Sequence, residues 1–171
     1  MKYGIYYAYW EKEWNGDYKY YIDKISKLGF DILEISCGAF SDYYTKDQEL
    51  IDIGKYAKEK GVTLTAGYGP HFNESLSSSE PNTQKQAISF WKETLRKLKL
   101  MDIHIVGGAL YGYWPVDYSK PFDKKRDLEN SIKNMKIISQ YAEEYDIMMG
   151  MEVLNRFEGY MLNTCDEALA Y

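Results

Sequence analysis

Residues 17–36 read DYKYYIDKISKLGFDILEIS, and this stretch predicts an amphipathic helix followed at once by a strand. In its first part, apolar residues recur at the three- and four-residue spacing of one helix face. The run FDILEIS at 30–36 is apolar and β-branched, as strands are. Gly29 stands between the two, where the end of a helix favours glycine. We therefore expect a helix over 17–28 and a strand over 30–36.

The same alternation continues along the whole chain. Further strands are expected at 2–9, 62–68, 103–107 and 146–154, and further helices at 45–60, 82–101, 125–145 and from 165 onward. Thr45 is the expected N-cap of its helix and Gly61 its stop. Strands that alternate with helices of this length form βαβ units around a parallel sheet.

The loops after the third, fourth and fifth strands are long, whereas the returns from helix to strand are tight. This asymmetry is typical of barrels that carry their sites at the carboxyl ends of the strands. The predicted fold is an α/β parallel barrel of the TIM type, with residues 1–171 as a single domain. Because a complete (β/α)₈ barrel takes about 250 residues, we expect an incomplete barrel of about five strands, interrupted in its fifth helix.

Composition excludes several classes of function. The net charge is −5 without a dense block of Lys or Arg, which disfavours binding to nucleic acid or to anionic membranes. No apolar run approaches the roughly 20 residues of a membrane span, and the N-terminus lacks the features of a signal peptide. Cys37 and Cys165 lack CxxC spacing, so we expect buried thiols rather than a zinc site. The sequence favours a cytoplasmic protein.

Carboxylates near strand ends are the first candidates for chemistry. Glu152 opens EVLNRFE (152–158) in an apolar strand, where burial costs several kcal/mol unless the group is paired or binds a metal. The alternative is a structural carboxylate that bonds to backbone N–H groups or joins Arg156 and Glu158 in an ion-pair network. Glu34 has the analogous place on the second strand, where a structural role is favoured.

Aromatic residues gather after two of the strands. They could form the wall of a sugar pocket or plug the mouth of the barrel: Tyr6, Trp10 and Trp14 after the first strand, and Tyr111, Tyr113 and Trp114 after the fourth. The glycines at strand ends do not have GxGxxG spacing, so no dinucleotide site is predicted. His104 alternates with Ile103 and Ile105 and is expected in the core.

Five segments in this order resemble one family. They are GIYYAYWEKEW (4–14), LGFDILEIS (28–36), LTAGYGP (64–70), DIHIVGGALYGYWPVDY (102–118) and MEVLNRFEGYMLNT (151–164). Together they resemble the D-psicose (D-allulose)/D-tagatose 3-epimerases, over essentially the whole chain. The resemblance implies a metal-dependent TIM-barrel isomerase, usually oligomeric, that interconverts ketohexoses such as D-fructose and D-psicose at C3.

The resemblance also implies roles for particular residues. Glu152 would be a ligand of a divalent metal, Mn²⁺ or Co²⁺, and one of two acid/base carboxylates, whereas Glu158 would bind substrate hydroxyls. Further substrate-binding positions would be Tyr6, Trp14, Gly67, Ala109 and Trp114. The family's remaining ligands (an Asp, a His and a second Glu, which is also the second acid/base group) have no counterpart among the 171 residues. We therefore expect this chain alone to be inactive.

Two alternatives remain open at this point. The first is another sugar isomerase or dehydratase of the xylose-isomerase-like kind, which YWP and NRFE argue against. The second is a non-catalytic half-barrel that binds a sugar or a partner. Formation of an aldose in place of a C3 epimer would indicate the first, and binding without turnover the second.

Overall fold

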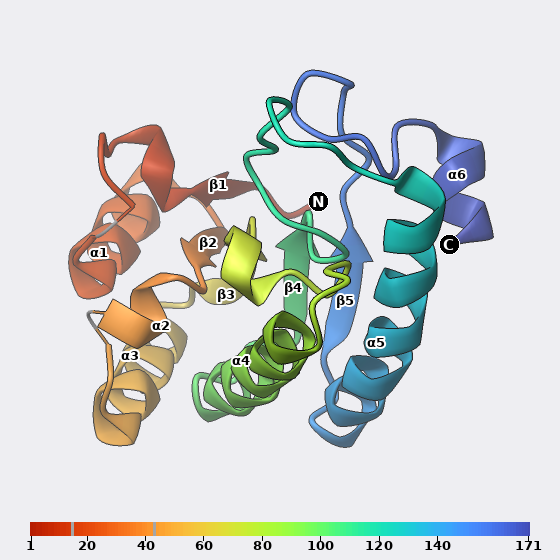
Figure 1. Cartoon of the computed structure of the whole chain (residues 1–171). Coiled ribbons are helices and arrows are strands. Elements are labelled where there is room, and N and C mark those ends of the chain that lie inside the picture. The colour runs from red at the N-terminus through yellow and green to blue at the C-terminus, as the bar shows by residue number, and fades with distance from the viewer. Residues whose placement is uncertain (15, 43) are drawn as a thin grey trace. The chain divides into compact units, whose positions relative to one another are not determined.

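The computed structural model describes residues 1–14, 16–42 and 44–171, and over these residues it contains a five-stranded sheet with the order β1-β2-β3-β4-β5 (Figure 1). The strands are β1 (Gly4–Tyr6), β2 (Ile32–Ser36), β3 (Thr63–Tyr68), β4 (Ile105–Gly108) and β5 (Met148–Met151). β1 and β3 both pair parallel with β2, with Tyr6 opposite Glu34 and Ser36 opposite Gly67. The predicted alternation of helices with parallel strands is confirmed.

The longer helices follow the strands as the sequence predicts. They are α1 (Tyr18–Leu28), α3 (Asp47–Glu59), α4 (Pro81–Leu100), α5 (Lys124–Glu144) and α6 (Cys165–Ala170). Three short elements were not predicted: the 3₁₀ turns η1 (Tyr7–Tyr9) and η2 (Phe72–Glu74), and the single-turn helix α2 (Ala39–Asp42). All three lie after strand ends, and a single turn is too short to show an apolar periodicity in the sequence.

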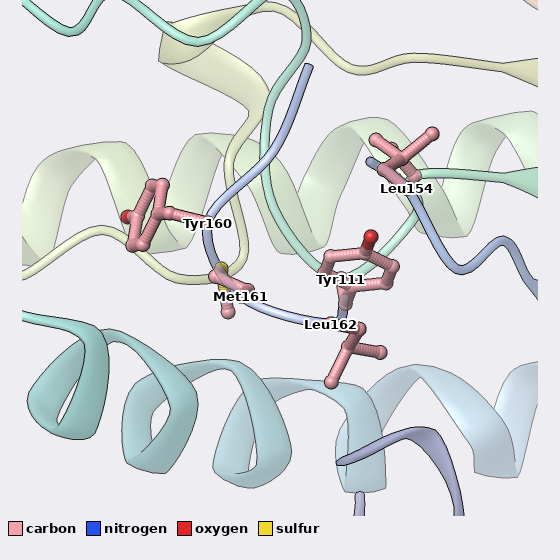
Figure 2. Packing of buried hydrophobic residues seen from close by; sticks show 6 residues of the cluster. Tyr111, Leu154, Tyr160, Met161 and Leu162 are labelled. Carbon is pink, nitrogen blue, oxygen red and sulfur yellow. The ribbon is translucent and has the colours of Figure 1, made fainter. Parts of the chain in front are cut away.

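The chain divides into two compact units. The first comprises residues 1–67 and 94–106, and the second residues 68–93 and 107–171. In the first unit, fully buried side chains from α1, β2 and α3 form the core, among them Ile22, Ile25, Leu33, Ile35 and Leu50. In the second unit, a buried cluster joins the loop after β4 to the loop after β5; its members are Ala109, Tyr111, Leu154, Tyr160, Met161 and Leu162 (Figure 2).

One turn geometry returns α1, α3, α4 and α5 to the strands that follow them. In each case a residue with positive φ stands just after the helix: Gly29 (80°), Gly61 (71°), Asp102 (60°) and Asp146 (56°). The next N–H donates to the carbonyl five residues earlier, from Phe30 to Ile25, Val62 to Ala57, Ile103 to Leu98 and Ile147 to Ala142. This is the hydrogen bond of a Schellman motif, which satisfies a carbonyl that the helix end leaves open. The predicted stops at Gly29 and Gly61 are confirmed.

Several boundaries differ from expectation for local reasons. The N-cap of α3 is Lys46, without a side-chain bond, so the prediction of Thr45 is wrong. β4 begins at Ile105, and His104 is exposed with Nε2 3.2 Å from Oδ1 of Asp102, so it is not a core histidine. Cys37 is buried as expected, whereas Cys165 is exposed. No helix in the described part of the chain has the length and apolar character needed to cross a membrane.

Candidate active site

The first group of predicted site residues lies at the carboxyl ends of β1 to β3 in the first unit. Tyr6 ends β1 and is in register with Glu34 of β2, and Gly67 lies near the end of β3. A methyl group on Gly67 would lie 2.8 Å from Oε1 of Glu34. The missing side chain of Gly67 therefore leaves room for the Glu34 carboxylate, and the structure brings Glu34 beside both Tyr6 and Gly67.

Trp14 joins this group through Tyr6. The two ring centroids lie 6.2 Å apart, and the Trp14 side chain remains 58% exposed. Burial, and to a smaller extent the neighbouring Tyr7 and Glu34, raise the pKa of Tyr6, so its phenol stays protonated over the physiological range. The pair thus combines an exposed aromatic surface with a polar hydroxyl, which is the combination that suits a sugar.

Glu152 occupies the corresponding place in the second unit. It follows β5 directly, and its backbone is held on both sides: its N–H donates to the Gly108 carbonyl at 3.0 Å, and its carbonyl accepts from the Tyr111 hydroxyl at 2.9 Å. The Glu152 side chain is exposed, so the expectation of a carboxylate buried inside the strand is wrong. An anchored backbone with an exposed carboxylate suits a group that accepts a proton from a ligand.

Glu158 lies in the loop that follows Glu152 and is held by Asn155. The Asn155 side-chain oxygen accepts from the N–H groups of Phe157 (2.9 Å) and Glu158 (3.1 Å), and its amide donates to the Glu158 carboxylate. The alternative of an ion-pair network through Arg156 is not found: within residues 1–14, 16–42 and 44–171, Arg156 forms an ion pair with neither Glu152 nor Glu158. Glu158 is exposed.

Trp114 is positioned by the loop after β3. Its N–H donates to the Pro70 carbonyl at 2.8 Å, and its Cβ would lie 3.0 Å from a methyl group on Gly69. Ala109, 4% exposed, belongs to the buried cluster of the second unit. Glu152, Glu158, Ala109 and Trp114 thus all lie on the loops that follow β4 and β5. Their arrangement around a single sugar together with Tyr6, Trp14 and Gly67 stays a prediction.

Two residues that support the site were not recognised from the sequence. Tyr111 is predicted only as part of an aromatic pocket wall or of a plug in the barrel mouth, yet its hydroxyl donates to the backbone carbonyl of Glu152. Asn155 has no predicted role, although an Asn that bonds to backbone N–H groups two and three residues later is a recognisable turn signal. Hydroxyl-to-backbone contacts such as that of Tyr111 join residues 41 apart in sequence and leave no local pattern.

The described residues do not form a metal site by themselves. Among residues 1–14, 16–42 and 44–171, no three His, Cys, Asp or Glu side chains are grouped so that they could hold an ion. Mn²⁺ and related ions require about six ligands, largely oxygen. Glu152 could supply one of these, and the remaining positions would need other donors.

Comparison with known proteins agrees with this architecture. D-psicose 3-epimerase of Enterocloster bolteae is 57% identical over 171 residues, which are 100% of this chain and 57% of that protein. The corresponding protein of Ruminiclostridium cellulolyticum is 46% identical over 100% of this chain and 58% of its own length. A crystal structure of D-psicose 3-epimerase with D-tagatose, from Clostridium cellulolyticum H10, superposes with a TM-score of 0.96 at 46% identity, over 99% of this chain and 58% of that one.

The chain thus spans a little under three fifths of the length of these relatives. Residues 22–171 match the family described as xylose isomerase-like TIM barrels, which covers most of the chain, including β2 to β5 and the helices between them. On this match, the chain belongs to the family of xylose isomerase-like TIM barrels.

Proposed function

We propose that residues 1–171 act, as one domain, within a ketose 3-epimerase that interconverts ketohexoses such as D-fructose and D-psicose. The observation that carries the proposal is the position of Glu152, an exposed carboxylate on an anchored backbone at the carboxyl end of β5. The relatives named D-psicose 3-epimerase, identical at up to 57% over the whole chain, support the substrate class.

Epimerisation at C3 requires a proton to leave carbon and return on the opposite face. The C3 proton is acidified by the adjacent C2 carbonyl, and a carboxylate placed against it acts as general base. We propose Glu152 for this role on one face of the sugar. A second acid/base group is needed on the other face to complete the inversion.

The remaining predicted residues would bind and orient the ketose. We propose that Glu158 accepts hydrogen bonds from sugar hydroxyls, since its carboxylate is exposed and its loop is fixed by Asn155. Tyr6 and Trp14 would contribute the aromatic surface of the first unit, and Trp114 that of the second. Gly67 would serve the sugar site by leaving room for the Glu34 carboxylate, and Ala109 by its place in the buried cluster that supports the loop after β4.

We also propose a divalent ion, Mn²⁺ or Co²⁺, with Glu152 as one of its ligands. Such an ion, when bound, would supply charge stabilisation for the enediolate oxygens. Because the described residues group no three metal-binding side chains, we expect residues 1–171 alone to bind Mn²⁺ weakly and not to turn over a ketose. Calorimetric titration of the metal-free chain with Mn²⁺ tests this; tight stoichiometric binding would contradict it.

The test of the function uses Glu152→Gln. The variant is made in a chain extended beyond Tyr171 by the corresponding C-terminal part of the 57% identical relative. Loss of a general base lowers rates by about 10²- to 10⁴-fold, so we expect a decrease of that size in D-psicose formed from D-fructose, measured by chromatography. Glu144→Gln, the same change at the exposed end of α5, is the matched control.

Three outcomes would contradict the proposal. Turnover retained by Glu152→Gln would exclude Glu152 as the base. Formation of an aldose in place of D-psicose would indicate a sugar isomerase of the same fold. An extended chain that folds and binds ketoses without converting them would indicate a binding module.

A further inference from the structure

A buried carboxylate outside the proposed catalytic groups lies in the first turn of α5. Asp127 is only 6% exposed, and it accepts a hydrogen bond of 2.7 Å from the Tyr160 hydroxyl. It also accepts from the backbone N–H of Asp123 at 3.3 Å and from the guanidinium of Arg126 at 3.2 Å. Burying a carboxylate is unfavourable unless such donors surround it. The three donors therefore stabilise the buried carboxylate of Asp127 in this position.

Tyr160 belongs to the closed loop that carries Glu158. The loop, residues 154–163, is closed at its base by the Leu154 N–H, which donates to the Leu162 carbonyl at 3.1 Å. The Asn163 side chain strengthens this closure by donating to the carbonyls of Leu154 (2.9 Å) and Gly159 (2.8 Å). Glu158 stands two residues before Tyr160.

The hydrogen bond from Tyr160 to Asp127 connects this loop to the long helix α5. Tyr160 is 9% exposed and belongs to the buried cluster that also contains Met161 and Leu162, and Figure 2 shows its ring at the side of Met161. Burial and the bond to Asp127 raise the pKa of Tyr160, so its hydroxyl keeps the proton and remains the donor. The α5 helix spans Lys124–Glu144 and packs against β5 (Figure 1), so it offers a rigid anchor.

We propose that Asp127 is a positioning residue, which acts through Tyr160 to fix the 154–163 loop and with it the substrate-binding carboxylate of Glu158. The role of Glu158 in this inference rests on the proposed function. The hydrogen-bonded link from Asp127 through Tyr160 to the loop (the anchor) does not depend on it. Asp127 itself contacts no reacting group. Its effect is to reduce the number of conformations from which Glu158 meets a sugar.

The first experiment follows amide hydrogen exchange in the full 171-residue chain. A hydrogen bond to a charged group stabilises the bonded state by roughly tenfold to a hundredfold. In Tyr160→Phe and Asp127→Ala we therefore expect the amides of Phe157, Glu158 and Gly159 to exchange at least about tenfold faster. The amides of α5 beyond its first turn should be unchanged; the first turn is excluded because Asp127→Ala also removes the acceptor of the Asp123 N–H. Asp127→Asn keeps an oxygen that can accept from Tyr160, so it should restore slow exchange.

A matched control comes from the first unit. The Tyr56 hydroxyl bonds to Asp23 at 2.8 Å and joins α3 to α1, so Tyr56→Phe removes the same type of bond away from the 154–163 loop in sequence. It should leave exchange in the loop unchanged. Exchange that rises equally over α5, β5 and the loop would reduce Asp127 to a general stabilising role, and unchanged exchange in the loop would exclude the anchor.

The second experiment separates the anchor from the proposed function. In the extended chain, Tyr160→Phe should raise KM for D-fructose by about tenfold with little change in kcat, since only binding interactions are loosened. A loop that exchanges faster while KM stays constant would overturn the positioning role but leave the epimerase proposal intact. An extended wild-type chain without any ketose conversion would contradict the proposed function, while the exchange pattern would still decide whether the anchor exists.

Discussion

Gly108, the last residue of β4, should be far less tolerant of substitution than its neighbour Gly107. Its φ of 126° is a conformation that L side chains rarely adopt, and a methyl group there would lie 2.1 Å from the Tyr68 carbonyl oxygen. Backbone cannot swing aside as a flexible side chain can. Overpacking costs roughly 1–3 kcal/mol and a disfavoured φ about the same again, so Gly108→Ala should lower the free energy of unfolding by about 2–6 kcal/mol.

Gly107→Ala is the matched control, because a methyl group at Gly107 has only the Gly150 carbonyl near it, at 3.9 Å. Replacing a glycine without strain stabilises by about 0.4–1 kcal/mol, so this variant should be as stable as wild type or slightly more so. Urea unfolding of the 171-residue chain, followed by circular dichroism, gives both values. Equal midpoints and slopes for the two variants would refute the reasoning.

Three further predictions concern the charge, the core and the site. The hydrogen bond from Lys124 lowers the pKa of Glu167, so the folded state is stabilised above the usual Glu pKa and loses this stabilisation as the pH falls through the lowered pKa. Between pH 6 and pH 3 the melting temperature should therefore drop further in wild type than in Glu167→Gln. Equal drops in the two proteins would contradict this. Leu162 is 1% exposed, so Leu162→Ala should lower the free energy of unfolding by about 2–5 kcal/mol. Leu169 is 86% exposed, so Leu169→Ala should leave this free energy almost unchanged; urea titration of both variants checks the difference. Trp14→Ala should leave the urea midpoint of the 171-residue chain almost unchanged but raise KM for D-fructose several-fold in the extended chain; an unchanged KM would remove Trp14 from the sugar site.

The helices and their stops were predictable because their signals are local. The apolar face of 17–28 and the glycines at 29 and 61 determine where α1 and α3 end, whatever the rest of the chain does. Strand ends were less well predicted, because an apolar run does not show where pairing stops. β5 ends at Met151 rather than Leu154, which places Glu152 outside the strand and exposed.

The site was predictable as a set of strand-end residues but not as a set of contacts. The aromatic and acidic residues after β1, β4 and β5 followed from the alternating pattern and from the family resemblance. The supporting bonds did not, because Tyr111 to Glu152 and Tyr160 to Asp127 join residues 41 and 33 positions apart. Such pairs depend on how the loops fold back, which no periodicity encodes.

The repeated turn after α1, α3, α4 and α5 also bears on how the chain folds. Each of these turns is closed by a hydrogen bond that spans only five residues, as from Phe30 to Ile25 and from Ile147 to Ala142. Contacts this local form early, because little chain entropy is lost in closing them. During synthesis, each turn can therefore form as soon as the helix before it is complete. It then fixes the direction of the strand that follows, before the next strand in the sheet has been synthesised. We expect such a chain to gain structure one helix–strand step at a time, from the N-terminus onward.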